Sequence, residues 1–156
     1  MTREQIASIF ERRRAAFDRQ DAAALAADYT HDCTIDSPSG GTHHGPAAAE
    51  RVLANVFDAL DVTLRQESVI IDGDSVAEVV SIEGKDVGNF LGLPPTGKSF
   101  HVPGVFLYEL KDGLIVRERR IYDFAGLLMF SVALLTIFGI DKLAAPLFVE
   151  RTRKAS

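Results

Sequence analysis

The chain has 156 residues, of which 47% are hydrophobic and 25% charged, and its formal net charge is −5. This length and balance fit one globular domain with a buried core and exclude a disordered chain. The acidic charge argues against nucleic acid as a partner, and the only basic run, Arg12–Arg14, is interpreted as the solvated face of a helix.

The helices are expected in the first part of the chain. Thr2 with Gln5 predicts a capping box that opens a first helix, because each side chain can satisfy a free backbone N–H group. Asp21 is the expected N-cap of a second, Ala-rich helix that ends near Tyr29. Pro46 suits the first turn of a third helix, which carries one apolar stripe.

Strands are expected between and after these helices. Residues 33–36 are β-prone and residues 37–41 form a loop. Beyond Asp61 the pattern is that of antiparallel strands joined by Asp-Gly turns. The expected strands there cover residues 69–71, 76–80, about 100–110 and 114–123. Helices followed by an antiparallel meander predict an α+β fold in a single domain, 1–156, with its core at about 1–128.

An apolar C-terminal extension is expected over about residues 124–150. Residues 124–140 contain no charge and are apolar on every helical face, which predicts a buried helix. The segment is shorter than the roughly 18–20 residues of a membrane span. It is expected to pack against the sheet and a partner subunit, to close a pocket as a lid, or to lie in a membrane interface.

Cysteine usage and the N-terminal residues indicate a cytoplasmic protein. Cys33 is the only cysteine, so no internal disulfide and no cysteine-based metal cluster can form. The polar residues 1–5 are not followed by an apolar signal segment, and we therefore expect a cytoplasmic location.

Several ordered motifs resemble the nuclear-transport-factor-2-like superfamily and, within it, the SnoaL-like polyketide cyclase family. The resemblance runs from the first helix to about Leu128. The stretches that carry it are residues 28–33 (DYTHDC), 41–45 (GTHHG), 71–76 (IDGDSV), 92–98 (GLPPTGK) and 112–113 (DG) leading into 119–128 (RRIYDFAGLL).

The resemblance implies a cone-shaped α+β barrel. In this fold three N-terminal helices pack on a strongly curved, mainly antiparallel sheet and enclose a pocket for a small hydrophobic organic ligand. The superfamily includes cyclases, ketosteroid isomerases, epoxide hydrolases, dehydratases and non-enzymatic proteins, so the fold alone does not determine function. It also implies a homodimer formed through the sheet and chemistry without a cofactor.

The residues argue against ketosteroid isomerase activity. The isomerase's general-base Asp precedes the proline after the first strand, where this chain has Ser37, and Asp36 faces the opposite side of the strand. Its oxyanion-binding Asp falls near Phe106 and its Tyr near Arg13. All three catalytic positions therefore differ.

Asp123 is the first candidate for proton transfer. The resemblance to the polyketide cyclases implies an acid–base Asp near the end of the last strand, and desolvation beside Phe124 would raise the pKa of Asp123. The alternative is that Asp123 caps the following helix. Alternation places Arg119 on the same strand face, where it would depress that pKa and resemble the Asp–Arg–Asp arrangement of the epoxide hydrolases.

His101 and Asp86 are the lesser catalytic candidates. An imidazole on the strand after residue 99 can act as a base near pH 7, and the alternative is a structural or interface histidine. Asp86 stands beside Lys85, and its alternative is a surface ion pair at a strand end. The residues expected to contact the ligand are Tyr29, Phe57, Phe90, Phe106, Tyr108, Arg119 and Tyr122.

No metal site is expected. His43 and His44 are adjacent and point in different directions, and no acidic ligand follows them or His31 at a zinc-like spacing, so all three are interpreted as loop histidines. The favoured function is cofactor-free acid–base chemistry, an aldol-type cyclisation or isomerisation, on a hydrophobic cyclic substrate. The alternatives are a non-catalytic ligand-binding or accessory dimer, and an epoxide hydrolase-like or dehydratase activity.

Overall fold

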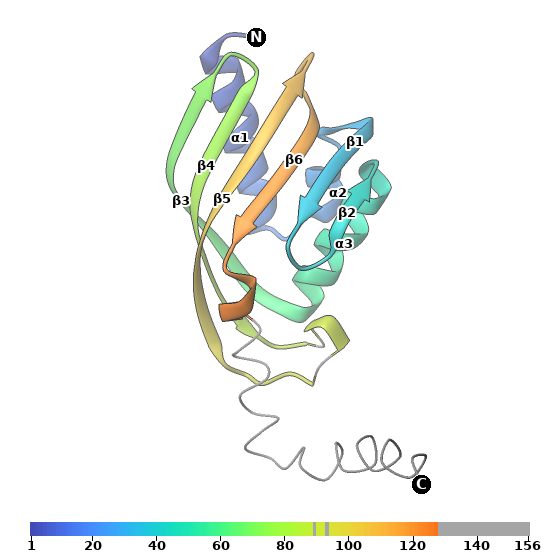
Figure 1. Cartoon of the computed structure of the whole chain (residues 1–156), viewed down its shortest axis with the longest axis vertical. Coiled ribbons are helices and arrows are strands. Elements are labelled where there is room, and N and C mark those ends of the chain that lie inside the picture. Colours follow the sequence, from blue (N-terminus) through green and yellow to red (C-terminus); the bar gives the residue numbers. More distant parts are fainter. Residues whose placement is uncertain (89, 93, 128–156) are drawn as a thin grey trace, which may run out of the picture.

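The computed structural model describes residues 1–88, 90–92 and 94–127, and these form an α+β fold in which helices pack on a curved six-stranded sheet (Figure 1). The predicted α+β class with a curved sheet is therefore confirmed. Most of the predicted C-terminal extension lies outside the described residues. Within the described part, no helix has the length and hydropathy needed to cross a membrane.

The helices begin where their caps predict. Helix α1 (Arg3–Asp18) opens on the Thr2–Gln5 capping box, in which the Gln5 N–H donates to Thr2 Oγ1 at 3.2 Å and the Thr2 N–H to Gln5 Oε1 at 2.8 Å. Helix α2 (Ala22–Ala26) has Asp21 as its N-cap and ends earlier than predicted, because Tyr29 already belongs to a strand. Helix α3 (Pro46–Ala59) begins at its proline.

The sheet has the strand order β2-β1-β6-β5-β4-β3. Strands β1 and β6 run parallel and all other neighbours are antiparallel. The strands are β1 (Tyr29–Ser37), β2 (Gly41–His44), β3 (Leu60–Asp72), β4 (Ser75–Asp86), β5 (Ser99–Lys111) and β6 (Leu114–Tyr122). Strand β1 is longer than predicted, and His43 and His44, expected in a loop, lie on the edge strand β2 because residues 38–40 reverse the chain onto β1.

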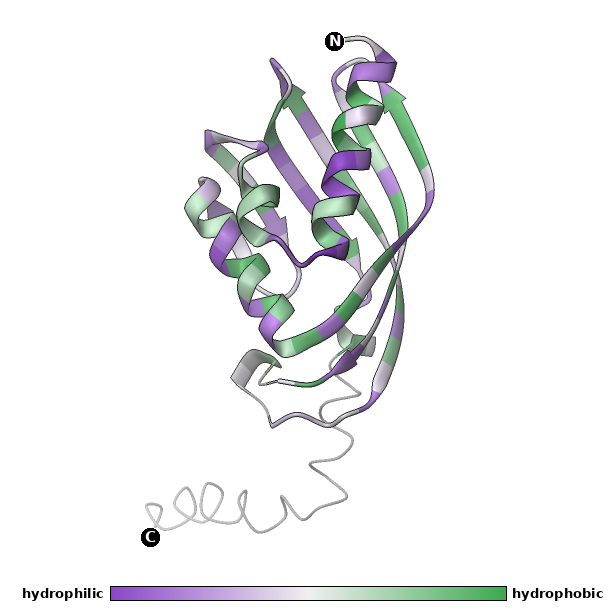
Figure 2. Cartoon of the chain, turned by 180° about the vertical axis from the view of Figure 1, so that it is seen from behind, coloured by the Kyte–Doolittle hydropathy of each residue, from purple (hydrophilic) through white to green (hydrophobic). Residues whose placement is uncertain are grey.

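The long strands β3, β4 and β5 bend the sheet into a half-open cone (Figure 1). Register shifts between Gln66 and Ser68 and between Glu109 and Leu110 are the irregularities that let antiparallel strands coil strongly. Helices α1, α2 and α3 cover the concave face (Figure 2). The sheet and helices thus leave an internal space between them.

The core under α1 is mostly apolar but includes one charge. Ile6 and Phe10 of α1 pack against Val80, Tyr108 and Ile115 of the sheet. Arg13 is also buried, at 7% exposure. The interpretation of the basic run as a solvated face is therefore wrong for Arg13, because α1 turns this position toward the concave face of the sheet.

Candidate functional site

A cavity of about 130 Å³ lies between the concave face of the sheet and helices α1 and α3. Its wall is mainly aliphatic and aromatic, as expected for a pocket that takes a small organic ligand. The polar side chains in this wall are Arg13, Arg14, Ser39, Gln66, Glu78, Tyr108, Glu118, Arg120 and Tyr122.

The central strands place these polar groups in two rows across the concave face. Glu78 of β4 is paired with Phe106 of β5, and Phe106 with Arg120 of β6. One row further, Tyr108 is paired with Glu118. Neighbouring strands are about 4.8 Å apart, so the Glu78 and Arg120 backbones lie about 10 Å apart on either side of Phe106.

Glu118 is the centre of a buried hydrogen-bonded network. It is 1% exposed, accepts from Arg120 Nε at 2.5 Å, and accepts a second hydrogen bond from the Tyr29 hydroxyl. The Arg120 guanidinium also lies over the Phe106 ring, 5.8 Å from its centroid. Tyr29 therefore stands behind Glu118 and outside the cavity lining.

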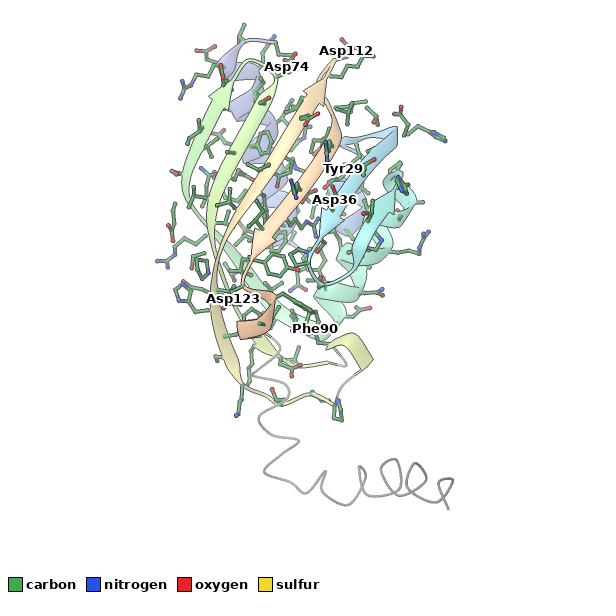
Figure 3. All side chains as sticks on the ribbon, viewed as in Figure 1. Tyr29, Asp36, Asp74, Phe90, Asp112 and Asp123 are labelled. Atoms are coloured by element: carbon green, nitrogen blue, oxygen red, sulfur yellow. The ribbon has the colours of Figure 1, made fainter. Side chains whose placement is uncertain are left out.

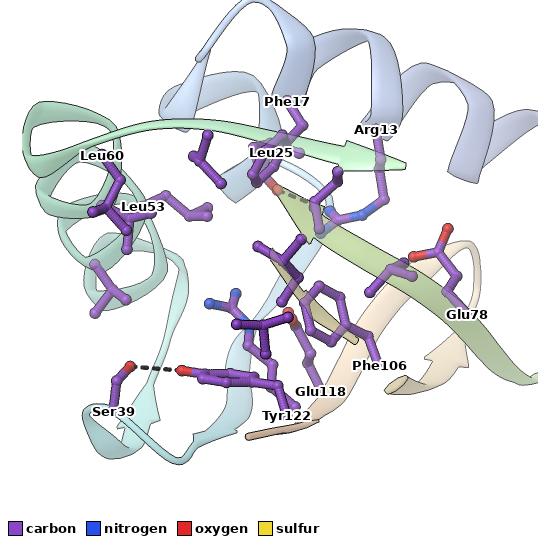
Figure 4. Close-up of a pocket in the computed structure, with 18 of the residues that line it drawn as sticks. Arg13, Phe17, Leu25, Ser39, Leu53, Leu60, Glu78, Phe106, Glu118 and Tyr122 are labelled. Atoms are coloured by element: carbon purple, nitrogen blue, oxygen red, sulfur yellow. Dashed lines mark hydrogen bonds and ion pairs between the residues drawn. The ribbon is translucent and has the colours of Figure 1, made fainter. Parts of the chain in front are cut away.

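Arg13 holds this network from the helix side. Its guanidinium donates to the Leu25 carbonyl at 3.0 Å (Figure 4). It also donates to Asp28 Oδ2 at 3.3 Å and to the Tyr29 hydroxyl at 3.1 Å. Asp28 is also bound by Arg12 at 2.5 Å. The network thus joins α1 to β1 and β6 through charged groups that have partners, which is the condition for burying them.

The pKa values of the two carboxyl groups in the cavity wall are shifted in opposite directions. Burial alone would raise the pKa of Glu118, but the charges of Arg120 and Arg13 outweigh burial and lower it, so Glu118 stays ionised. Burial raises the pKa of Glu78, and the described residues form no salt bridge with it. Glu78 is therefore the carboxyl group suited to exchange a proton.

A cluster of hydroxyl groups lies on the opposite side of Phe106 from Glu78 (Figure 4). The Tyr122 hydroxyl donates to Ser39 Oγ at 2.8 Å and lies 3.2 Å from Ser37 Oγ. Ser37 follows Asp36 at the end of β1, where β1 is paired with β6 beside Arg119. These hydroxyl groups can donate hydrogen bonds to a ligand oxygen.

The structure places Asp123 away from the cavity. Its carboxylate accepts from the Gly126 N–H at 2.9 Å and thus caps the helical turn that begins at Phe124. The side chain is exposed, and Figure 3 shows it at the end of β6, far from Tyr29. This is the geometry of a helix cap, which was the alternative role considered for Asp123. Arg119, on the same face of the strand, is exposed on the outer side of the sheet.

His101 and Asp86 also lie outside the cavity lining. His101 is exposed on the outer face of β5, where its Nε2 is 2.6 Å from Ser81 Oγ. Asp86 is buried at 6% exposure and accepts from the N–H and hydroxyl of Thr96 at 2.9 and 2.8 Å. It ties the loop after β4 to the strand and does not form the surface ion pair considered above.

Four of the seven expected ligand contacts do line the cavity: Phe90, Phe106, Tyr108 and Tyr122. Phe57 instead packs edge-on against Phe17, with ring centroids 5.1 Å apart. Sequence reasoning missed Glu78, Glu118 and Arg120 as cavity residues. Glu78 lies at an alternate position of the same strand as Val76, Val80 and Ile82. This pattern could have predicted that its side chain shares their face of the sheet.

The described residues contain no group of three or more His, Cys, Asp or Glu side chains arranged to hold a metal ion. His31 lies on β1, and His43 and His44 lie on β2. The polar side chains of the cavity wall carry carboxyl, guanidinium, hydroxyl and carboxamide groups.

Known proteins are similar to this chain in sequence and in fold. The SnoaL-like polyketide cyclase family model matches residues 7–129. Nogalonic acid methyl ester cyclase from Streptomyces nogalater is 32% identical over 103 residues, which cover 65% of this chain and 75% of that protein. This chain belongs to the SnoaL-like polyketide cyclase family, and the resemblance seen in the sequence is confirmed.

Solved structures show the same nuclear-transport-factor-2-like fold. A candidate SnoaL-like polyketide cyclase from Jannaschia sp. CCS1 matches with a TM-score of 0.72 and 24% identity, over 82% of this chain and 92% of that chain. A protein with a ketosteroid isomerase-like fold from Catenulispora acidiphila DSM 44928, solved with trimethylamine, matches with a TM-score of 0.67 and 21% identity, over 79% and 91% of the two chains.

Proposed function

We propose that this protein is a cyclase-like enzyme that transfers a proton on a small, largely apolar carbonyl compound. The observation that carries the proposal is the arrangement inside the cavity. A carboxyl group with a raised pKa, Glu78, and a hydroxyl donor, Tyr122, lie on opposite sides of the aromatic floor formed by Phe106 (Figure 4).

These groups have the chemistry that an intramolecular aldol reaction requires. The Glu78 carboxylate accepts a proton from the carbon next to a carbonyl group, and the electron pair of that C–H bond moves to the carbonyl oxygen as an enolate. The Tyr122 hydroxyl, whose single proton turns from Ser39 Oγ to the ligand, donates a hydrogen bond to this oxygen. The enolate carbon then bonds to a second carbonyl carbon of the same molecule, and the resulting alkoxide takes the proton back from Glu78.

The size and surface of the cavity support such a substrate. A cavity of about 130 Å³ has room for roughly four water molecules at about 30 Å³ each, and an apolar cavity of about 150 Å³ takes up a benzene ring. Leu60, Val62, Phe100 and Val102 extend the apolar wall beyond Phe106. An apolar wall excludes water, which strengthens the hydrogen bond to a developing enolate.

The proposal is tested by proton exchange on a compound that needs no knowledge of the natural substrate. 2-Tetralone in D₂O loses its α-protons to solvent at a rate that NMR measures directly. We expect the protein to accelerate this exchange and Glu78→Gln to reduce the acceleration at least 100-fold, because general acid–base groups contribute about 10²–10⁴-fold.

Glu83→Gln is the matched control. Glu83 lies on the same strand, accepts from Ser81 at 3.3 Å and is not part of the cavity wall, so its variant should keep the full rate. Unchanged exchange in a folded Glu78→Gln protein would contradict the role of Glu78. Binding of 2-tetralone without any acceleration would favour the alternative, a non-catalytic ligand-binding protein.

A further inference from the structure

The Arg120 guanidinium is only partly used by the protein. Its Nε donates to Glu118 at 2.5 Å, and this is the one hydrogen bond that Arg120 makes within the described residues. Its side chain is 13% exposed and contributes to the cavity wall. Both terminal nitrogens therefore remain available on the cavity side, fixed in direction by the bond through Nε.

Arg13 differs from Arg120 in that both terminal nitrogens of its guanidinium group are used within the protein. Its terminal nitrogens bond to Leu25, Asp28 and Tyr29, so they are occupied by protein acceptors. Glu118 fixes Arg120 by one edge only. The opposite edge of a guanidinium group presents two parallel N–H donors, which match the two oxygens of a carboxylate.

The three arginines of the wall differ in their partners. Arg13 is paired with Asp28 at 3.3 Å, and the half-buried Arg14 donates to Gln66 Oε1 at 2.9 Å. Arg120 is bound through Nε to Glu118, and its terminal nitrogens have no protein acceptor within the described residues. An anionic ligand that binds these two nitrogens supplies the missing acceptors.

We propose that the ligand of this cavity is an organic carboxylic acid, whose carboxylate binds the two terminal nitrogens of Arg120 while its apolar body lies over Phe106. The inference rests on the proposed function in that it names the substrate class for the same site. Arg120 and Tyr122 are two residues apart on one face of β6, about 6.5 Å along the strand. A keto acid can therefore place its carboxylate at Arg120, its carbonyl oxygen at Tyr122 and its acidic C–H toward Glu78.

The test compares an acid with its neutral amide. 2-Naphthoate and 2-naphthamide have nearly the same shape, and calorimetric titration of the full chain at pH 7 measures the affinity of each. We expect 2-naphthoate to bind at least tenfold more tightly, because hydrogen bonds between charged partners are stronger than neutral ones. Arg120→Gln should reduce this ratio to about one, with most of the loss of affinity falling on 2-naphthoate.

Two further variants keep the test decisive. Arg119→Gln changes the neighbouring exposed arginine, which lies outside the cavity, and should keep the wild-type ratio. If Arg120→Gln does not fold because Glu118 is left unpaired, the double variant Glu118→Gln/Arg120→Gln removes both charges of the pair and should also show a ratio of about one.

The inference is overturned if wild type binds the amide as tightly as the acid, or if a folded variant without Arg120 keeps the preference. The proton-exchange assay reports separately on the proposed function. Exchange that depends on Glu78 without any acid preference would contradict only the substrate class. An acid preference that depends on Arg120, with no exchange, would support the acid site and contradict the enzymatic role.

Discussion

Glu118 is the residue on which the buried network depends. Its carboxylate accepts from Arg120 and Tyr29, and Arg13 approaches it from the helix side. Burial works against the charge of Glu118, and only these donors and cations keep it ionised. Removing one partner of a buried pair leaves the other charge uncompensated, which costs more than the pair contributes when intact.

We therefore expect Glu118→Gln to lower the free energy of unfolding by about 3–5 kcal/mol at pH 7. The folded-state pKa of Glu118 lies below its ordinary value of 4.5, so its stabilisation is complete above about pH 4.5 and is lost as the pH falls through the lower folded pKa. Urea denaturation from pH 7 to pH 3 should show a flatter acid limb for the variant. Glu109→Gln, at an exposed carboxylate, is the control and should keep the wild-type slope.

The sequence divides the residues of the last strand between its two faces, but it does not show which face lines the cavity. Alternation puts Arg119 and Asp123 on one face of the last strand and Glu118, Arg120 and Tyr122 on the other. Which face lines the cavity depends on the side from which α1 and α3 cover the sheet. The family's acid–base position suggested the set with Asp123, whereas the helices cover the other set.

The bend of the long strands is the feature of the secondary structure that creates the cavity. At the lower end of β4, Gly84 lies so close to β3 that a β-carbon there would be 2.5 Å from the Asp61 carbonyl oxygen and 2.8 Å from the Phe100 ring. Gly104 of β5 is less crowded, with its nearest neighbour at 3.3 Å. The chain thus uses glycine where two strands and an aromatic ring converge.

We expect Gly84→Ala to destabilise the fold by about 1–3 kcal/mol, because a backbone oxygen cannot move away from the new methyl group as a side chain can. Gly104→Ala should cost clearly less. Thermal unfolding of both variants followed by circular dichroism measures the difference. Equal midpoints for the two variants would show that the close approach at Gly84 does not constrain the bend.

The elements themselves were largely predictable because their signals are local. The Thr2–Gln5 capping box, the Asp21 cap and the Asp-Gly turns depend on neighbouring residues only. The edge strand β2 and the parallel pairing of β1 with β6 were not predicted. Such pairings join segments far apart in the chain, and the short polar strands involved carry little periodicity.

The outer face of the sheet carries exposed apolar side chains and a groove that are separate from the cavity. Ile70, Ala77 and Leu107 form one row across β3, β4 and β5, and Ile70 and Leu107 are 61% and 37% exposed. A shallow groove of about 380 Å³ runs over this row. Acidic groups from β3 and β5 and basic groups from β6 border it, so the face carries both signs of charge.

We propose that this outer face binds a second copy of the chain, since a two-fold arrangement can bring the basic edge of each copy against the acidic edge of the other. Light scattering coupled to gel filtration should give the mass of a dimer for the wild type. Leu107→Glu should shift it to the monomer, whereas Leu114→Glu, at a similarly exposed leucine at the start of β6, should not. A monomeric wild type would contradict the proposal.

The sequence by itself determined the α+β class, the helix caps, most of the strands and the family, because these follow from local periodicity, turn residues and ordered motifs. Tertiary structure decided which face of each strand lines the cavity. It places Glu78, Arg120 and Tyr122 in the cavity wall and leaves Asp123 and His101 outside it. The physical reason is that a strand presents two chemically different faces, and only the packing of the helices against the bent sheet determines which face is enclosed.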